Sequence, residues 1–96
     1  MKKNFDRELL ADVAEKLINH LKNRNDVQNI DLMNLSGFCR NCLSKWYASA
    51  AEKKKLSISY DEAREMIYGM PYEEWKNKYQ TEITSDQKEK FKTNKS

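Results

Sequence analysis

The sequence predicts an all-α protein, a small bundle of four to five helices that we expect to pair as a homodimer. Only two glycines and one proline occur among 96 residues, and no long run alternates with a period of two. Apolar residues instead recur at three- and four-residue spacing, which is typical of amphipathic helices. Apolar residues make up 39% of the chain and charged residues 34%. A core this small in a chain this short gives marginal stability, which pairing of two copies offsets.

The first predicted helix starts near residue 6, because Asn4 or Asp6 can accept an unpaired backbone N–H as its cap. It ends before a polar turn at residues 23–26. His20 projects at the margin of its apolar stripe. That stripe consists of Phe5, Leu9, Leu10, Val13, Ala14, Leu17, Ile18 and Leu21.

A second helix is predicted from about Asp31 to Lys54, with Asp26 or Asp31 as its cap. Ser36 and Gly37 interrupt it, and a glycine inside a helix costs about 1 kcal/mol relative to alanine. Three outcomes stay open: a kink, the end of a short helix and the start of a new one, or a close helix crossing at the glycine. The expected stripe is Leu32, Leu35, Cys39, Cys42, Leu43, Trp46, Tyr47 and Ala50.

Residues with helix-starting and helix-ending preferences then delimit two further helices. Ser59 and Glu62 have the spacing of a capping box, and Gly69 suits the left-handed position that ends a helix. Pro71 fits the first turn of the next helix. Three aromatic residues fall on one face of that helix: Tyr72, Trp75 and Tyr79.

A second capping-box match, Thr84 with Gln87, opens a short final helix to about Phe91. We therefore predict a single helical domain over residues 1–91 and a disordered tail over residues 92–96.

The charge pattern argues against nucleic acid as a partner. Residues 84–96 hold four lysines and two acidic residues, and this segment carries +2 of the total net charge of +3. The rest of the chain is nearly neutral, with acids and bases interleaved, whereas nucleic-acid binding needs clustered lysine and arginine. No apolar run reaches the length of a membrane span, and no signal peptide is visible. Two cysteines without a secretory context predict a cytoplasmic location.

The motif Cys39-Arg-Asn-Cys42 is the main candidate for chemistry. Both thiols can be small buried residues of the stripe. They can also be two ligands of a zinc or iron site, because cysteines three residues apart lie on one helical face. The further ligands would then be His20 and Asp31, or the same cysteine pair from a second chain.

A third interpretation of the motif is a thiol–disulfide site. Such sites place the first cysteine at a helix N-terminus, which Gly37 permits if a new helix starts there. Arg40 would add positive potential. The βαβ pattern that usually surrounds such a motif is missing.

Three further features allow both a structural and a functional interpretation. His20 is either a partly buried, hydrogen-bonded histidine or a metal ligand. It is the only histidine, so a multi-histidine zinc site is excluded within one chain. The polar run Asp26, Gln28, Asn29, Asp31 and Asn34 either caps and turns the chain or lines a small polar pocket. Seven aromatic residues form the core or an interface: Trp46, Tyr47, Tyr60, Tyr68, Tyr72, Trp75 and Tyr79.

Four segments resemble a family of short bacterial proteins, the domain-of-unknown-function family numbered 1244. They begin at Asp26 (DVQNIDLMNL), Gly37 (GFCRNCLSKWY), Tyr60 (YDEARE) and Tyr68 (YGMPYEEW). The similarity runs from about residue 20 to residue 79, and the last dozen residues look specific to this chain. The resemblance implies an all-helical fold and a homodimer in a bacterium, but no activity.

We therefore expect a non-catalytic, homodimeric binding or assembly module with an unknown protein partner, no catalytic residues and no certain cofactor. Its dimer interface is expected to bury the aromatic and methionine-rich surface. The alternative is a metal-binding or thiol-redox protein that uses Cys39 and Cys42, with zinc or iron as the possible metal and His20 and Asp31 as further ligands.

Overall fold

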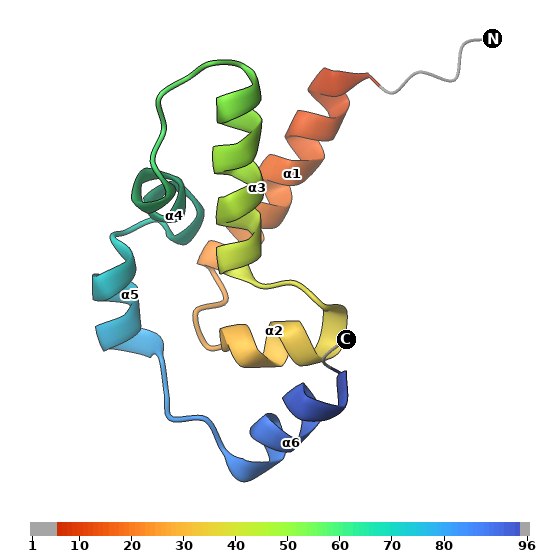
Figure 1. Ribbon diagram of the computed structural model, residues 1–96, viewed down its shortest axis with the longest axis vertical. Coiled ribbons are helices and arrows are strands. Elements are labelled where there is room, and N and C mark those ends of the chain that lie inside the picture. The colour runs from red at the N-terminus through yellow and green to blue at the C-terminus, as the bar shows by residue number, and fades with distance from the viewer. Residues whose placement is uncertain (1–5, 95–96) are drawn as a thin grey trace, which may run out of the picture.

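A computed structural model of the chain describes residues 6–94, and this part consists of helices joined by turns and short linkers, with no strand. Six helices follow one another along the chain (Figure 1). They are α1 (Arg7–Lys22), α2 (Asn29–Ser36), α3 (Arg40–Lys53), α4 (Tyr60–Tyr68), α5 (Tyr72–Tyr79) and α6 (Ser85–Asn94). The all-α prediction is confirmed, but the number of helices exceeds the four to five expected.

The additional helix arises because the helix predicted from Asp31 to Lys54 is two helices. Gly37 ends α2 in the left-handed conformation, with φ of 82°, and its N–H donates to the Met33 carbonyl at 2.9 Å. Residue Cys39 is extended and α3 starts after it. The chain changes direction at this point, so α2 lies across the lower end of α3 (Figure 1). Of the three outcomes left open at the glycine, the break is the one observed.

The break also divides the apolar stripe that was expected to run through both helices. Leu35 is 86% exposed and Trp46 is 59% exposed, so neither belongs to a continuous buried seam. The face of α3 that is buried carries Arg40, Ser44 and Ala51 instead. This face packs closely against α4 because its small side chains allow the two helices to approach.

The core contains Ile67, Tyr68 and Trp75. The rings of Tyr68 and Trp75 meet edge to face, with centroids 5.1 Å apart. Five partly buried residues surround this cluster: Ile18, Leu43, Met70, Tyr72 and Tyr79. The expectation that these aromatic residues form a dimer surface is therefore wrong for Tyr68 and Trp75, which are buried within one chain.

Helix α1 contacts the rest of the protein mainly through α4 and extends away from the other helices toward its N-terminal end (Figure 1). Asp6 caps this helix, because its side chain accepts the N–H of Glu8 at 2.8 Å. Asp6 is one of the two predicted caps; the other, Asn4, lies outside the described residues. Leu21, near the C-terminal end, is buried. The N-terminal half of the apolar stripe therefore has no cover from the described part of the chain.

Three of the predicted helix ends in the second half of the chain are confirmed. Ser59 and Glu62 form the complete capping box, and Gly69 ends α4 with φ of 81°. Thr84 and Gln87 exchange bonds of 2.8 and 3.1 Å before α6.

Three details of the helix ends differ from the prediction. The cap of α2 is Gln28 rather than Asp26 or Asp31, because the chain enters this helix two residues before Asp31. Pro71 is the residue before α5 rather than inside its first turn. Helix α6 continues past Phe91 to Asn94, so residues 92–94 of the expected tail are helical. The remaining residues of that tail, 95–96, lie outside the described part. Among the described residues, no helix is long and apolar enough to cross a membrane.

Candidate functional site

The two cysteines lie together at the start of α3. Cys39 is the residue before the first turn of the helix and Cys42 lies within that turn. Their Sγ atoms are 4.0 Å apart, and both are free thiols. Cys39 is buried, whereas Cys42 is partly exposed and its Sγ lies 3.9 Å from the Met33 Sδ. The structure thus pairs the sulfur atoms and leaves one of them accessible.

The other two proposed ligands are not part of this pair. His20 is exposed on α1, and the Asp31 carboxylate accepts a hydrogen bond of 2.9 Å from the Gln87 amide on α6. No group of three or more histidine, cysteine or acidic side chains within residues 6–94 could hold a metal ion. One chain therefore brings together only two of the four ligands, Cys39 and Cys42.

Two opposing effects act on the first thiol. Burial raises the pKa of the Cys39 thiol, because the thiolate loses water. The backbone amides of Asn41 and Cys42 at the start of α3 act in the opposite direction and lower it, but burial is the larger effect. At neutral pH Cys39 is thus a protonated thiol.

The Arg40 side chain does not serve the thiols, as the sequence had suggested, but holds the loop between α1 and α2. It is only 1% exposed. Its Nη1 donates to the Val27 carbonyl at 2.8 Å and to Asn29 Oδ1 at 3.0 Å, and its Nη2 donates to the Arg24 carbonyl at 2.8 Å. The guanidinium also stacks 4.9 Å from the centre of the Trp75 ring. These partners are neutral acceptors, so burial lowers the pKa of Arg40 and no carboxylate restores it by a direct bond.

A chain of hydrogen bonds continues from this arginine into the core. Asn29 Nδ2 donates to the Tyr68 hydroxyl at 3.0 Å, and that hydroxyl donates to Asn41 Oδ1 at 2.7 Å. Burial raises the pKa of Tyr68 strongly, so it stays a neutral donor. Arg40, Asn29, Tyr68 and Asn41 thus form one network that joins four segments of the chain.

Gln28 connects the same loop to the segment after α5. Its Nε2 donates to the Tyr79 carbonyl at 2.8 Å, and its Oε1 accepts the Thr81 N–H at 3.0 Å. The polar run therefore has the structural role expected of it at Gln28 and Asn29. On α2, Asn34 Nδ2 also donates to the Gln87 carbonyl of α6 at 3.1 Å.

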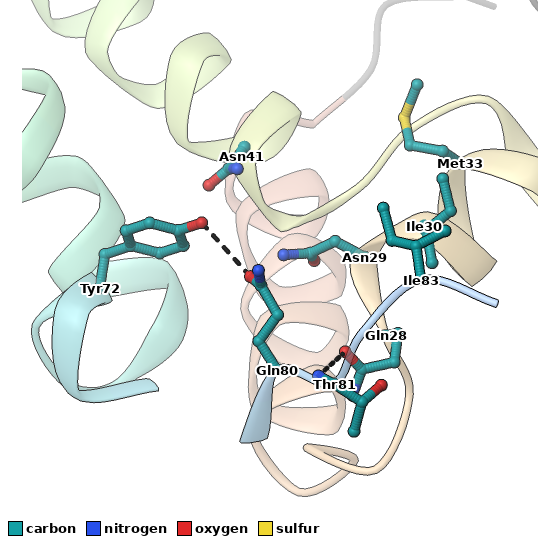
Figure 2. Close-up of a pocket in the computed structure, with 9 residues that line it drawn as sticks. All are labelled: Gln28, Asn29, Ile30, Met33, Asn41, Tyr72, Gln80, Thr81 and Ile83. Carbon is teal, nitrogen blue, oxygen red and sulfur yellow. Dashed lines mark hydrogen bonds between the residues drawn. The ribbon is translucent and has the colours of Figure 1, made fainter. Parts of the chain in front are cut away.

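The polar run also lines a small pocket, which was the functional alternative for it. The pocket has a volume of about 210 Å³ and lies between α2, the start of α3, α5 and the segment after α5 (Figure 2). Asn41 accepts from Tyr68 through Oδ1, and Gln80 accepts from the Tyr72 hydroxyl through Oε1 at 3.5 Å. Their amide N–H groups are left as donors for a bound group. The lining residues are Gln28, Asn29, Ile30, Met33, Asn41, Tyr72, Gln80, Thr81 and Ile83.

This lining determines which chemistry the pocket can support. Its polar groups are amides and hydroxyls, including the hydroxyl of Tyr72, and its other side chains are apolar. Such groups donate and accept hydrogen bonds without carrying charge. The pocket is therefore suited to holding an uncharged polar group. Sequence reasoning missed Asn41, Tyr72 and Gln80 here, because they are brought to Asn29 only by the tertiary fold.

Comparison with known sequences gives one family. The sequence profile of the family described as "Protein of unknown function (DUF1244)" matches residues 27–93, which is more than half of the chain. The chain belongs to this family, and the resemblance inferred from its motifs is confirmed. The match continues to residue 93, so the segment after residue 79 is also part of the family pattern. Comparison with curated proteins gave no match.

Proposed function

Starting from membership of this family of unknown function, we propose that the protein is a non-catalytic homodimeric binding module of the bacterial cytoplasm. Two copies would associate through α1, and residues 1–91 would act as one domain. The observation that carries the proposal is the bare apolar stripe on the N-terminal part of α1. Four of its side chains are strongly exposed: Leu9 at 63%, Leu10 at 50%, Val13 at 67% and Leu17 at 40%.

The bare stripe is continuous with a buried one. At 100° per residue, Leu10 and Leu17 lie on the same side of the helix as Leu21 and Ile18. Leu21 is buried and Ile18 packs against the core cluster. The face that enters the core at one end of α1 therefore continues uncovered at the other end, and a second copy offers an identical stripe to cover it.

The extended form of the single chain supports the same conclusion. The radius of gyration of the structure is 15.3 Å. A compact domain of this length has a radius of gyration of about 12.5 Å. A chain that leaves one helix extended in this way exposes area that a dimer would cover.

The stripe is large enough to drive association. The exposed fractions of its four side chains are together equivalent to about two fully exposed aliphatic side chains. Burying one such side chain contributes roughly 1.5–3 kcal/mol, so each copy would gain roughly 3–7 kcal/mol. A two-fold dimer gains this twice, which offsets the loss of translational and rotational freedom on association.

Light scattering coupled to size-exclusion chromatography tests the proposal on the full-length protein. The wild type is expected to elute with the mass of two chains, and Leu10→Glu with the mass of one. Asn19→Glu is the matched control, because it makes the same change of charge at an exposed position on the opposite side of α1. A monomeric wild type, or equal behaviour of the two variants, would exclude this interface.

A second candidate function, metal binding or thiol redox chemistry, is favoured by the distance between the two sulfur atoms. Two thiolates bound to one tetrahedral zinc at about 2.3 Å lie about 3.8 Å apart, close to the 4.0 Å between Cys39 and Cys42. Since His20 and Asp31 lie elsewhere, such a metal would need further ligands from the second copy.

Metal analysis by mass spectrometry, with a thiol titration, separates the two forms of this candidate. The protein should be purified without an affinity tag or chelator. Stoichiometric zinc or iron with protected thiols would make the cysteines ligands, whereas metal-free protein with titratable thiols would leave redox chemistry.

A further inference from the structure

We propose that Cys39 and Cys42 form a thiol–disulfide exchange pair whose substrate is a disulfide in an apolar segment of another protein. In this pair Cys42 is the attacking thiol and Cys39 is the resolving thiol. The inference rests on the second candidate function above and does not depend on the dimer.

The backbone at the start of α3 allows the two sulfur atoms to bond. Residues three apart inside a helix have Cβ atoms about 5–6 Å apart, more than the 3.5–4.5 Å of a disulfide. Cys39 precedes the helix, however, with an extended backbone at φ −144° and ψ −176°. The distance between the two side chains is therefore not fixed by helix geometry, and their Sγ atoms lie 4.0 Å apart. Closing this gap requires side-chain rotation rather than unfolding of α3.

Exposure determines the order of attack. Cys39 is only 7% exposed, so it offers little surface to a disulfide of a second molecule. Cys42 is partly exposed and can be approached from solvent. Burial also raises the pKa of the Cys39 thiol, which reduces its thiolate fraction further. Cys39 can still react from inside the protein once Cys42 carries a bound group, because the two sulfur atoms are neighbours.

The ligands within one chain make a shared metal less suitable than exchange. A tetrahedral ion would need two more ligands beside the two sulfur atoms. Within residues 6–94 no further histidine, cysteine or acidic side chain joins the pair, so a metal would depend on a second copy. Exchange needs only one accessible sulfur, which Cys42 provides.

The surroundings of Cys42 indicate the type of substrate. Trp46 lies one turn further on the same face of α3, is 59% exposed and packs its ring 6.2 Å from that of Phe38. The Met33 sulfur also lies beside Cys42, at 3.9 Å from its Sγ. These apolar and aromatic side chains suit an apolar peptide segment better than glutathione, which carries several charges.

The reaction balances without another oxidant. The Cys42 thiol ionises, and its thiolate attacks one sulfur of the substrate disulfide. The S–S bond breaks, and the departing thiolate takes up a proton. Cys39 then loses its proton, and its thiolate attacks the Cys42 sulfur of the mixed disulfide. The bond between Cys42 and the substrate breaks, and the second substrate sulfur leaves as a thiolate that takes up a proton. The two cysteines are oxidised to an intramolecular disulfide, and the substrate is reduced to two thiols.

Acid quenching, alkylation and mass spectrometry of the full-length protein test this order. The reduced protein is mixed with either oxidised glutathione or a synthetic peptide disulfide that has leucine and phenylalanine beside the cystine. We expect the wild type to lose both thiols without an adduct. Cys39→Ser should accumulate one mixed disulfide, whereas Cys42→Ser should keep its thiol. Cys39→Ala serves as a second resolving-site variant if the serine destabilises the buried position.

Substrate preference is measured with a surface variant. The peptide disulfide is expected to react faster than glutathione, and Trp46→Ala is expected to slow the peptide without slowing glutathione. Equal adduct formation on Cys42→Ser and Cys39→Ser, or a stable adduct on the wild type, would overturn the assignment of the two thiols. Faster reaction with glutathione would overturn the substrate class. Light scattering on the same samples reports the dimer separately, so failure of either proposal is seen by itself.

Discussion

Replacing Arg40 by methionine tests whether the buried guanidinium holds the loop between α1 and α2. The change removes three hydrogen bonds, two to the carbonyls of Arg24 and Val27 and one to the side chain of Asn29. The Val27 carbonyl loses its donor, which costs about 1–3 kcal/mol. The Arg24 carbonyl still accepts the Val27 N–H at 3.1 Å, and Asn29 Oδ1 still accepts the Arg40 N–H at 3.4 Å, so each of these two lost bonds costs about 0.5–1.5 kcal/mol. Loss of stacking on Trp75 adds about 1–2 kcal/mol. The substitution also removes the cost of keeping a charged group out of water, which offsets part of this loss. The net loss in the free energy of unfolding is about 3–5 kcal/mol.

Thermal and urea unfolding, followed by circular dichroism, measure this loss. For a domain of this size, 1 kcal/mol shifts Tm by about 4–8 °C, so the variant should melt more than about 12 °C lower. Arg24→Met is the matched control. It removes only an exposed ion pair with Asp26 and keeps the backbone carbonyl that Arg40 uses, so it should cost less than about 1 kcal/mol. A loss below about 1 kcal/mol for Arg40→Met would refute the anchoring role.

Three further predictions concern single positions. Gly37→Ala should lower the free energy of unfolding by about 1–2 kcal/mol, because φ is +82° and an alanine is strained in this conformation. The cost is conformational, since an added Cβ meets no atom within 4 Å. Urea unfolding would show no loss if the left-handed turn were unimportant. Tyr68→Phe should cost about 1–3 kcal/mol by the same measurement, because the partly buried Asn29 amide loses its acceptor and Asn41 Oδ1 loses its donor. The pKa of Glu62 is lowered because its carboxylate accepts the Ser59 N–H. The ionised carboxylate therefore stabilises the folded state at pH values above the pKa that Glu62 has in the unfolded chain. This stabilisation is lost as the pH falls through the lower pKa of the folded state. Glu62→Gln should therefore flatten the acid side of the stability–pH curve, and an unchanged curve would contradict this.

The features that the sequence predicts well are local. The capping boxes at Ser59 and Thr84 and the glycine end of α4 depend on residues within one turn of each other. Such interactions form in any tertiary context, so their positions could be read from the spacing of residue types alone.

The features that it predicts poorly depend on tertiary contacts. The choice between a kink and a break at Gly37 depends on whether α2 has another surface to pack on, and α6 provides that surface from more than 50 residues away. The burial of Arg40 was missed for a similar reason, since its acceptors are the carbonyls of a loop. A signal was present, because Arg40, Ser44 and Ala51 share one face, but small side chains on a helix do not by themselves reveal which face is inside.

The candidate site was predicted in part. The pairing of Cys39 with Cys42 follows from their spacing, and the polar run was correctly expected either to turn the chain or to line a pocket. The expected ligands His20 and Asp31 do not join the cysteines in one chain, because α1 carries His20 on its exposed side and α6 engages Asp31. Metal binding through a second copy stays a prediction that the metal analysis addresses.

The two hydrogen bonds of Gln28 have a consequence for how the protein opens. One side chain acts here as a short piece of strand, pairing with the backbone at Tyr79 and Thr81 in the way a neighbouring chain would. Helix α6 follows this segment, buries little apolar surface and packs mainly on α2, where Asn34 and Asp31 bond to Gln87. We expect α6 to detach as a separate cooperative unit, so its amides should exchange with deuterium before those of α3 and α4. Gln28→Ala should then speed the exchange of amide protons in α6 but not in α3 or α4. The free energy of opening calculated from these exchange rates should lie well below the free energy of global unfolding.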